Sequence, residues 1–381
     1  MTAGQIDDLS AYLIAGRVKA RPSGRSETDE RTPRQGIRDG VEAESIGFRR
    51  VFISERWNLK EASVLLGAVG ALTSRVGLGT GLINPASRHP LHTAAVGSTL
   101  TAAFGNRVVL GLGRGDDNMF KGTGLAAYGF EGLADYVGII KRLWAGETVS
   151  YHGPAGNYDS LALGDVHEGP PPEIWYGMFG LPRGARLAAA CMDGVLLVPN
   201  MTPDATRATV TRLRRECERI DRDPDTLRIA QCVVTAPELD DLETRQVAHA
   251  RAFTYLQAPG YGDALCRVNG WDSSIVAALS DHPKLAGTSR IADNVFHRSE
   301  LVAAAALIPE QWITESCAIG SVDECVAQFR RFRDAGADEL VTYGSTPGQN
   351  ATLAREWASS PAQAASMPDG TGFRDNSLSG Q

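Results

Sequence analysis

The chain lacks the marks of several protein classes. Its 381 residues include only six cysteines, which lie far apart without a Cys-x-x-Cys pair, and this argues against a zinc site and a disulfide framework. No apolar run approaches the roughly 18 residues of a transmembrane helix. The polar, acidic stretch from Met1 to Ser10 is unlike a secretory signal. The chain also lacks an excess of positive charge, and its net charge of −7 favours neither nucleic acid nor an anionic membrane as a partner. A soluble, cytoplasmic, globular protein is therefore expected.

Short apolar runs alternate with amphipathic segments along the whole chain. Parallel strands covered by helices are buried on both faces, so they are continuous apolar runs in the sequence. Eight runs fit this description: Ala11–Arg17, Arg50–Ser54, Val76–Ile83, Arg107–Gly113, Glu173–Gly177, Gly194–Pro199, Leu227–Thr235 and Glu339–Gly344. The segments between them that fit helices are Gly36–Ile46, Leu59–Thr73, Leu91–Phe104, Leu133–Trp144, Pro182–Cys191, Asp204–Ile220 and Val322–Ala335. This repeated alternation predicts an α/β fold, a closed (β/α)8 TIM barrel.

Three stretches depart from the alternation. Lys19–Gln35 is polar and rich in Arg, Ser and Pro, which predicts a long, mobile first βα loop. Gln246–Pro309 has a mostly helical pattern between the seventh and eighth strands, where additions to a barrel build the mouth of the active site. It is a candidate substrate lid, or else a helical pair that packs on the barrel or on a partner subunit. The expected organisation is one domain, 1–358, with the insertion 246–309, followed by a disordered tail, 359–381.

Glycines are dense where the third and fourth strands end, and the functional face of a barrel lies at these strand ends. The glycines concerned are Gly79, Gly81, Gly111, Gly113 and Gly115. Glycine is unfavourable in a strand unless the backbone bulges or another group approaches closely. A flat ring cofactor lying on bare backbone is one interpretation, and tight packing within the barrel is the other.

A second glycine-rich stretch, Gly177–Gly180, follows an apolar strand and comes just before Pro182, which suits a first helical turn. Backbone N–H groups at a helix N-terminus bind anions, and barrels often hold a phosphate in this way. The stretch therefore predicts a phosphate site, with an ordinary βα turn as the alternative.

Two acidic residues, Glu55 and Asp116, follow the second and fourth strands. Partial burial would raise the pKa of either carboxyl and suit proton transfer. A salt bridge to Arg56 or Arg114 would instead lower that pKa and make the residue structural. Arg56, next to Trp57, could hold an anionic or carbonyl substrate, or form a plain cation–π contact or ion pair.

Other catalytic signatures are missing. The sequence contains no Gly-x-Ser-x-Gly elbow and no local Cys–His constellation, so covalent nucleophilic catalysis is not indicated. His89 and His92 have i, i+3 spacing at a predicted helix start, but no third ligand lies near them in sequence. A capping or packing role is favoured over a metal site.

At these residues the sequence resembles the bacterial luciferase-like family of flavin- and deazaflavin-dependent barrels, from about Leu13 to Trp357. The motifs that carry the resemblance are Ser54-Glu55, Thr73–Gly81, Arg88-His89-Pro90, Asn106–Gly115, Ala190–Val195 and Gly320–Cys325. Within the family, the Ser-Glu-Arg-Trp and Arg-His-Pro contexts are similar to oxidoreductases that use coenzyme F420, an 8-hydroxy-5-deazaflavin.

The resemblance implies a luciferase-like barrel that transfers a hydride between C5 of the deazaflavin and a small organic substrate. It also implies a homodimer and a non-prolyl cis peptide at Gly81–Leu82. The resemblance places ring contacts at Thr80, Gly81 and Leu82, and phosphate contacts at Gly177, Met178, Phe179 and Gly180. Gly113 and Gly115 are added to the cofactor-binding residues from the glycine density at the strand ends.

The sequence departs from the family pattern after the second strand. In sugar-phosphate and alcohol dehydrogenases of the deazaflavin group, an acidic residue there is followed by a catalytic histidine, whereas here Glu55 is followed by Arg56. Arginine cannot act as a general base near neutral pH. The predicted catalytic residues are therefore Glu55 and Asp116 as proton donor or acceptor, Arg56 as substrate clamp and Trp57 as a pocket wall. The alternatives are a monooxygenase that uses reduced FMN and oxygen, and a catalytically silent cofactor-binding barrel.

Overall fold

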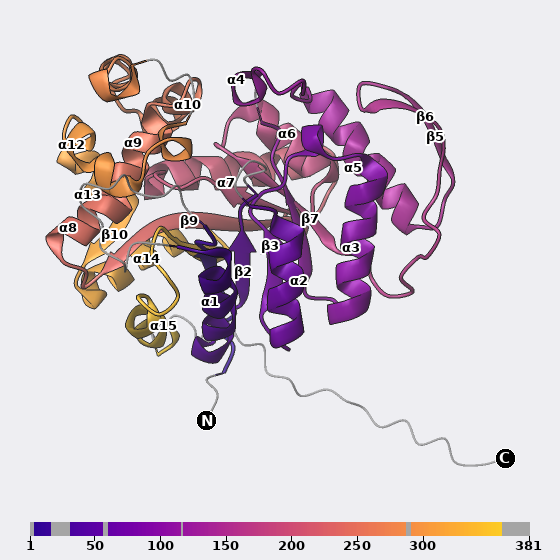
Figure 1. Ribbon diagram of the computed structural model, residues 1–381, viewed down its shortest axis with the longest axis horizontal. Helices are drawn as coiled ribbons and strands as arrows, with labels where there is room; N and C mark the ends of the chain where they lie inside the picture. The colour runs from indigo at the N-terminus through magenta and orange to yellow at the C-terminus, as the bar shows by residue number, and fades with distance from the viewer. Residues whose placement is uncertain (1–3, 17–30, 56–59, 116, 287–290, 360–381) are drawn as a thin grey trace, which may run out of the picture.

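The centre of the fold is a closed barrel of parallel strands, which helices surround (Figure 1). The computed structural model describes residues 4–16, 31–55, 60–115, 117–286 and 291–359. In these residues the barrel strands are β1 (Leu9–Leu13), β2 (Arg50–Ile53), β3 (Gly77–Thr80), β4 (Val108–Leu112), β7 (Glu173–Met178), β8 (Gly194–Leu197), β9 (Arg228–Pro237) and β11 (Glu339–Tyr343). Neighbours pair in this order, and the ring closes because β11 pairs with β1. The predicted (β/α)8 TIM barrel is confirmed.

The strands lie where the sequence predicts them because burial on both faces selects apolar side chains. Every residue of β1, β2, β3, β4, β8 and β11 is buried. Only the bounds differ, and the largest differences are at β1, which starts at Leu9 and ends at Leu13, and at β3, which ends at Thr80 and not at Ile83.

Helices cover the outside of the barrel. Those that were predicted are α1 (Pro33–Ile46), α2 (Ala62–Leu72), α3 (Pro90–Phe104), α5 (Phe130–Trp144), α6 (Pro182–Cys191), α7 (Pro203–Glu218) and α14 (Val322–Asp334). A further helix, α15 (Ala351–Ala358), follows the last strand.

Side chains cap the N-termini of several of these helices. Ser321 and Glu324 form a capping box on α14, and His89 caps α3 by accepting a hydrogen bond from Leu91 N at 3.2 Å. The capping role of His89 is thus confirmed. Among the described helices, none has the length and apolar character to cross a membrane.

The insertion between β9 and β11 is mostly helical, as predicted, but wider than Gln246–Pro309. Its elements are α8 (Asp241–Thr244), a π-helical turn (Arg245–His249), α9 (Ala250–Leu256), α10 (Tyr261–Asn269), α11 (Ser274–Ser280), α12 (Val302–Ala305) and α13 (Glu310–Ser316). It ends in a short strand, β10 (Cys317–Gly320), which pairs in parallel with β9. Figure 1 shows the insertion on one side of the barrel.

Several elements differ from the sequence expectation. An antiparallel hairpin, β5 (Val149–Gly153) and β6 (Gly156–Leu161), and the short helix α4 (Asp117–Phe120) were not predicted. The predicted loop Lys19–Gln35 extends too far, because α1 begins at Pro33. The rest of that loop up to residue 30, and the predicted tail beyond Ser359, lie outside the described residues.

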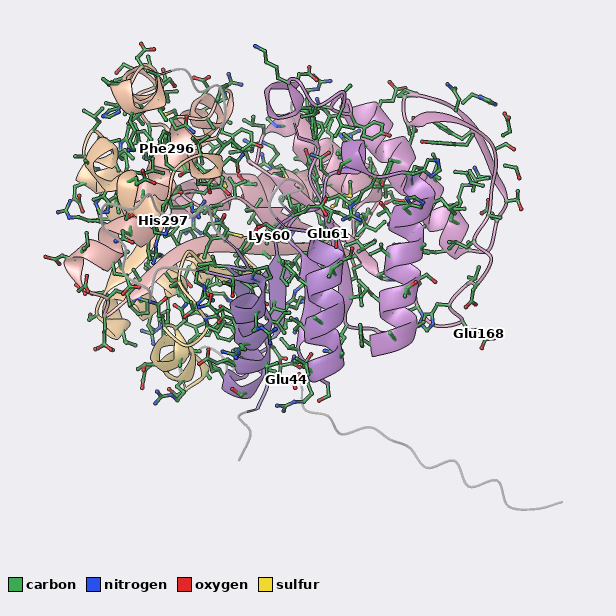
Figure 2. The ribbon with its side chains drawn as sticks, viewed as in Figure 1. Glu44, Lys60, Glu61, Glu168, Phe296 and His297 are labelled. Atoms are coloured by element: carbon green, nitrogen blue, oxygen red, sulfur yellow. The ribbon has the colours of Figure 1, made fainter. Side chains whose placement is uncertain are left out.

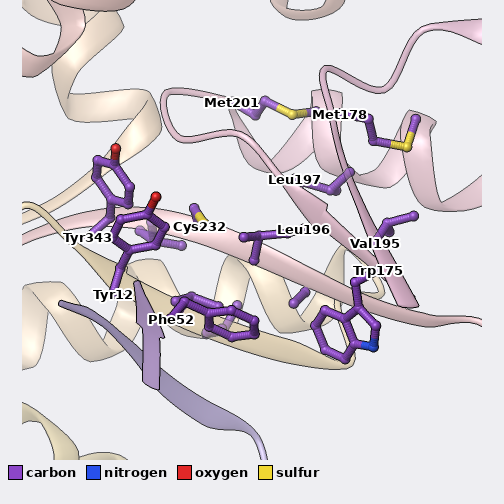
Figure 3. Close-up of a cluster of buried hydrophobic side chains, with 14 of the residues drawn as sticks. Tyr12, Phe52, Trp175, Met178, Val195, Leu196, Leu197, Met201, Cys232 and Tyr343 are labelled. Carbon is purple, nitrogen blue, oxygen red and sulfur yellow. The ribbon is translucent and has the colours of Figure 1, made fainter. Parts of the chain in front are cut away.

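Large apolar side chains fill the barrel (Figure 3). The rings of Phe52 and Trp175 lie 5.7 Å apart, and those of Tyr12 and Tyr343 lie 4.5 Å apart. The opposite end of the barrel, where the strands begin, is closed by the fully buried carboxylate of Glu339 and the arginines around it. The mouth at the carboxyl ends of the strands is therefore the face on which a site can form.

Candidate functional site

The third strand ends in a bulge at the mouth of the barrel. β3 stops at Thr80, and the next peptide bond, Gly81–Leu82, is cis, as the family resemblance implies. The bulge is tied to β2 and to β1, because Gly81 N donates to Ile53 O of β2 at 2.8 Å and the hydroxyl of Tyr12, on β1, donates to Gly81 O. These contacts fix the backbone on which the ring contacts of Thr80, Gly81 and Leu82 are predicted.

The bulge also accounts for glycines in the neighbouring strands. A Cβ atom on Gly111 would lie 2.1 Å from Thr80 O, and one on Gly177 would lie 2.0 Å from Leu82 Cδ1. The packing around Gly113 is looser, because a Cβ atom there would lie 3.1 Å from the same Leu82 methyl. At Gly111, where the obstacle is a backbone atom, packing within the barrel therefore suffices to require glycine, whereas at Gly177 the obstacle is a side-chain methyl that can move. Gly115 has a φ of +66°, in the left-handed region of backbone conformation, which glycine adopts more readily than other residues.

The carboxylate of Glu55 lies in an ion pair beside this bulge. Arg88 holds it with two nitrogens, Nη2 to Oε2 and Nε to Oε1, the latter at 3.3 Å. The side chain of Glu55 is only 4% exposed and that of Arg88 is 14% exposed. The backbone of Glu55 is attached to the bulge as well, because its N–H donates to Leu82 O at 3.2 Å. The partner is thus Arg88, neither of the two arginines considered from the sequence.

Arg88 binds a second carboxylate, that of Glu61, through the same Nη2 atom. Glu61 caps α2 and accepts from Val64 N at 2.6 Å and from Ser63 Oγ at 2.7 Å. Burial alone would raise the pKa of Glu61, but these bonds and Arg88 outweigh it and lower the pKa to about 2. Burial alone would likewise lower the pKa of Arg88, yet the two carboxylates raise it.

Sequence reasoning assigned no role to Glu61 or Arg88. Arg88 follows Glu55 by 33 residues and Glu61 by 27, and it stands on the loop after β3, whereas both glutamates stand on the loop between β2 and α2. The signal that could have identified Arg88 was the Arg88-His89-Pro90 string, which was used only for the family resemblance.

Cationic groups surround the start of α6, where the phosphate contacts are predicted. Gly180 has φ +78°, and its carbonyl accepts a hydrogen bond from Arg212. The helix has no side-chain cap, so its first N–H groups keep their donor capacity for another partner. The guanidinium groups of Arg114 and Arg183 both lie over the ring of Phe130, at 5.1 and 4.8 Å. This arrangement suits an anion.

A pocket opens where the mouth of the barrel meets the insertion. Its volume is about 580 Å³ when the part open to solvent is included. The barrel side of its lining comprises Tyr12, Leu13, Ile14, Gly16, Ser54, Lys60, Tyr343 and Gly344, and the insertion side comprises Arg251, Asp293, Phe296, His297 and Arg298. Figure 2 shows Lys60 next to Glu61 at the start of α2, and Phe296 and His297 on the insertion.

A partly buried ion pair within the insertion faces the barrel in this pocket. Arg251 Nη1 lies 2.7 Å from Asp293 Oδ2, and its guanidinium lies 5.3 Å from the ring centre of Tyr343. Burial would lower the pKa of Arg251, but Tyr343 and Asp293 raise it instead. A cation held in this way gives the pocket a fixed positive group on its insertion side.

Three of the predicted catalytic residues, Arg56, Trp57 and Asp116, lie outside the described residues. Arg114 is described, and its Nη1 donates to Tyr128 O at 3.1 Å. In the ranges that the structure describes, no three His, Cys, Asp or Glu side chains form a group that could hold a metal ion.

Comparisons with known proteins agree with this architecture. An F420-dependent glucose-6-phosphate dehydrogenase of Microbacterium testaceum is 34% identical over 45% of the chain, which spans about half (54%) of that relative. A 5,10-methylenetetrahydromethanopterin reductase of Methanolobus tindarius is 25% identical over 81% of the chain and 89% of that relative. The F420-dependent tetrahydromethanopterin reductase structure from Methanopyrus kandleri has a TM-score of 0.72 at 18% identity, covering 93% of this chain and 98% of that one. The family model of luciferase-like monooxygenases matches residues 14–339. The chain therefore belongs to the luciferase-like monooxygenase family.

Proposed function

We propose that this chain is an F420-dependent oxidoreductase that transfers a hydride between C5 of the deazaflavin and a small organic substrate. The observation that carries the proposal is the mouth of the barrel, where the Gly81–Leu82 bulge and the cationic start of α6 stand on the same face. A ring compound with a phosphate suits this combination. The names of the relatives support F420 as the cofactor.

The residues present fit such a group. Thr80, Gly81 and Leu82 would hold the ring, and Gly113 and Gly115 are proposed beside it. The loop from Gly177 to Gly180 would hold the phosphate. A Cβ at Gly180 would lie 2.2 Å from Thr209 Oγ1, so only glycine leaves this loop its path into α6. When bound, the deazaflavin supplies the carbon that gives or takes the hydride.

The chain itself would orient the substrate and manage the proton. We assign proton transfer to Glu55 and Asp116, with Arg56 as the clamp and Trp57 as a wall. The pocket between the barrel and the insertion is the proposed substrate site, since it opens beside Ser54, the neighbour of Glu55. Its insertion side would then act as the substrate lid.

The acid–base assignment is tested by the variants Glu55→Gln and Asp116→Asn. Turnover that survives in both variants would contradict the assignment, but it would leave the proposal of cofactor binding intact.

The first test is a fluorescence titration of the apo-protein with the deazaflavin and, separately, with FMN. We expect a Kd for the deazaflavin at least about tenfold below that for FMN, a difference of about 1.4 kcal/mol. A preference for FMN would favour the oxygen-using monooxygenase, which oxygen consumption with reduced FMN would then check. Binding of neither compound would favour the catalytically silent barrel.

We also propose a homodimer formed through α2 and α3. Neither helix contains Asp, Glu, Lys or Arg, although charged residues make up 22% of the chain. Val64 and Leu72, near the two ends of α2, are 71% and 62% exposed. An uncharged apolar surface of this kind marks a protein interface.

Replacing both Val64 and Leu72 by Asp should convert the dimer into a monomer, because the two protomers would then bury unpaired carboxylates in their interface. Size-exclusion chromatography with light scattering measures the mass directly. Leu242→Asp is the matched control, since Leu242 is 61% exposed on α8. A wild-type monomer, or a double variant with the wild-type mass, would refute this interface.

Finally, we propose a cytoplasmic location. All six cysteines are free thiols, and all but Cys191 are buried. Free thiols are typical of proteins in reducing compartments.

A further inference from the structure

We propose that Arg88 is a positioning residue that fixes Glu55 as a carboxylate attached to the β3 bulge, so that Glu55 can accept a proton but not donate one. This inference rests on the proposed function, because it decides between the two roles open to Glu55. If the enzyme runs in the direction that needs a proton donor, the donor is then another group, and Asp116 is the candidate.

The geometry leaves Glu55 little freedom. Its two carboxylate oxygens face two nitrogens of one planar guanidinium, the arrangement that best fixes a carboxylate in place. Its backbone N–H is bonded to Leu82 O at 3.2 Å, so both ends of the residue are attached to groups that follow β3. With 4% of its side chain exposed, water contributes little to holding the charge.

Arg88 is itself held from several directions. It follows the 3-10 turn Pro85–Ser87, in which Ala86 N donates to Asn84 Oδ1 at 3.0 Å. Its carbonyl accepts from the hydroxyl of Tyr136 at 3.2 Å, and its guanidinium is shared with Glu61. The guanidinium therefore keeps a second partner, Glu61, if the side chain of Glu55 moves, and it acts as an anchor for Glu55.

The charge balance gives the sharpest consequence. Glu55 and Glu61 both contact Nη2 of Arg88, so this one cation separates two carboxylates. The only other charged side chain described on these loops is that of Lys60, which lines the substrate pocket. Without Arg88, two like charges would share a partly buried site, and one of them would take up a proton. Glu55 is the more buried of the two, so it is the one expected to become neutral.

The test follows the protonation of Glu55 in the full chain without cofactor, by NMR of protein labelled with ¹³C at the glutamate carboxyl groups. Glu55→Gln assigns the signal by its loss. In Arg88→Gln, we expect the titration midpoint of that signal to rise by about one pH unit or more above wild type. In Arg88→Lys, which keeps the charge but not the two-nitrogen contact, the midpoint should stay near wild type. In Arg88→Gln with Glu61→Gln, part of the rise should disappear.

Arg214→Gln is the matched control. Arg214 pairs with Asp338 at 2.9 Å and is similarly buried, but it stands where β9 and β11 begin, at the far end of the barrel. It should leave the Glu55 midpoint unchanged even if it lowers stability. A Glu55 midpoint in Arg88→Gln equal to wild type, or one that moves equally in Arg214→Gln, overturns the proposal.

Cofactor binding and turnover separate this inference from the proposed function. Arg88→Lys should bind deazaflavin within about threefold of wild type while kcat falls by about tenfold, since a fixed orientation contributes to the chemical step more than to binding. Failure of the wild type to bind the deazaflavin would defeat the proposed function, whereas the NMR titration would still decide whether Arg88 holds Glu55 in its charged form. An unchanged kcat in Arg88→Lys, with binding intact, would count against positioning.

Discussion

Replacement of Glu339 by alanine is expected to lower the free energy of unfolding by about 3–5 kcal/mol. Its carboxylate is fully buried at the start of β11, where it accepts from Arg50 Nη1 at 2.5 Å and from Arg228 Nε at 2.7 Å, and also from the hydroxyl of Ser10. Arg50 is buried as well, so the substitution removes the nearest counter-charge of a buried cation and leaves it only the more distant carboxylate of Glu173, at 3.9 Å. Removal of one partner from a buried network is costly for this reason.

Urea denaturation followed by circular dichroism measures this loss. Glu216→Ala is the control, because Glu216 pairs with Arg219 on the surface at 2.7 Å and Arg219 is 59% exposed. The control should lose less than about 1 kcal/mol. A loss in Glu339→Ala no larger than in Glu216→Ala would mean that the arginines find other partners and that the network does not stabilise the barrel.

Gly111→Ala is the second substitution for which we expect a large effect, a loss of about 3 kcal/mol of stability together with weaker cofactor binding. The new Cβ would lie 2.1 Å from Thr80 O, a backbone atom that cannot move without displacing the end of β3. Gly177→Ala should be milder, at about 1 kcal/mol, because its Cβ meets the movable methyl of Leu82. The same denaturation and titration experiments measure both quantities.

Gly138→Ala is the control, because we expect this glycine-to-alanine substitution to raise the stability of the protein and not to lower it. Gly138 lies in the middle of α5 on its exposed side, and no atom lies within 4 Å of a Cβ built there. Alanine should therefore stabilise the protein by about 0.5–1 kcal/mol through helix propensity. If Gly111→Ala were as well tolerated as Gly138→Ala, the close approach of β3 to β4 would not be what requires glycine at 111.

The barrel could be predicted because its strands are buried on both faces and therefore form apolar runs in the sequence. The hairpin β5–β6 could not, because most of its residues are exposed and polar ones such as Ser150 and Asn157 interrupt the apolar pattern. β10 has four residues and follows α13 directly, so it was concealed at the end of a helical segment.

The candidate site was predicted in part for a similar physical reason. Strand ends are visible in a sequence, so Glu55 and the β3 glycines could be placed at the mouth. Which arginine meets Glu55 depends on how separate loops fold together, and no local pattern carries that information. Likewise, glycine at 111 indicates a close approach but not that Thr80 O makes it.

The pairing of β10 with β9 has a consequence for how this fold can change over time. The insertion leaves the barrel at Glu238 and returns at Gly320, and these two points are joined by a hydrogen bond of 2.7 Å from Glu238 N to Gly320 O. With the ends held together by the sheet, doubling the length of the segment between them costs only about 0.6 kcal/mol in loop entropy. The wall of the pocket that carries Arg251 and Asp293 is thus an exchangeable module. If the pocket binds substrate as proposed, replacement of this segment would alter the choice of substrate and leave the strands that position the bulge untouched.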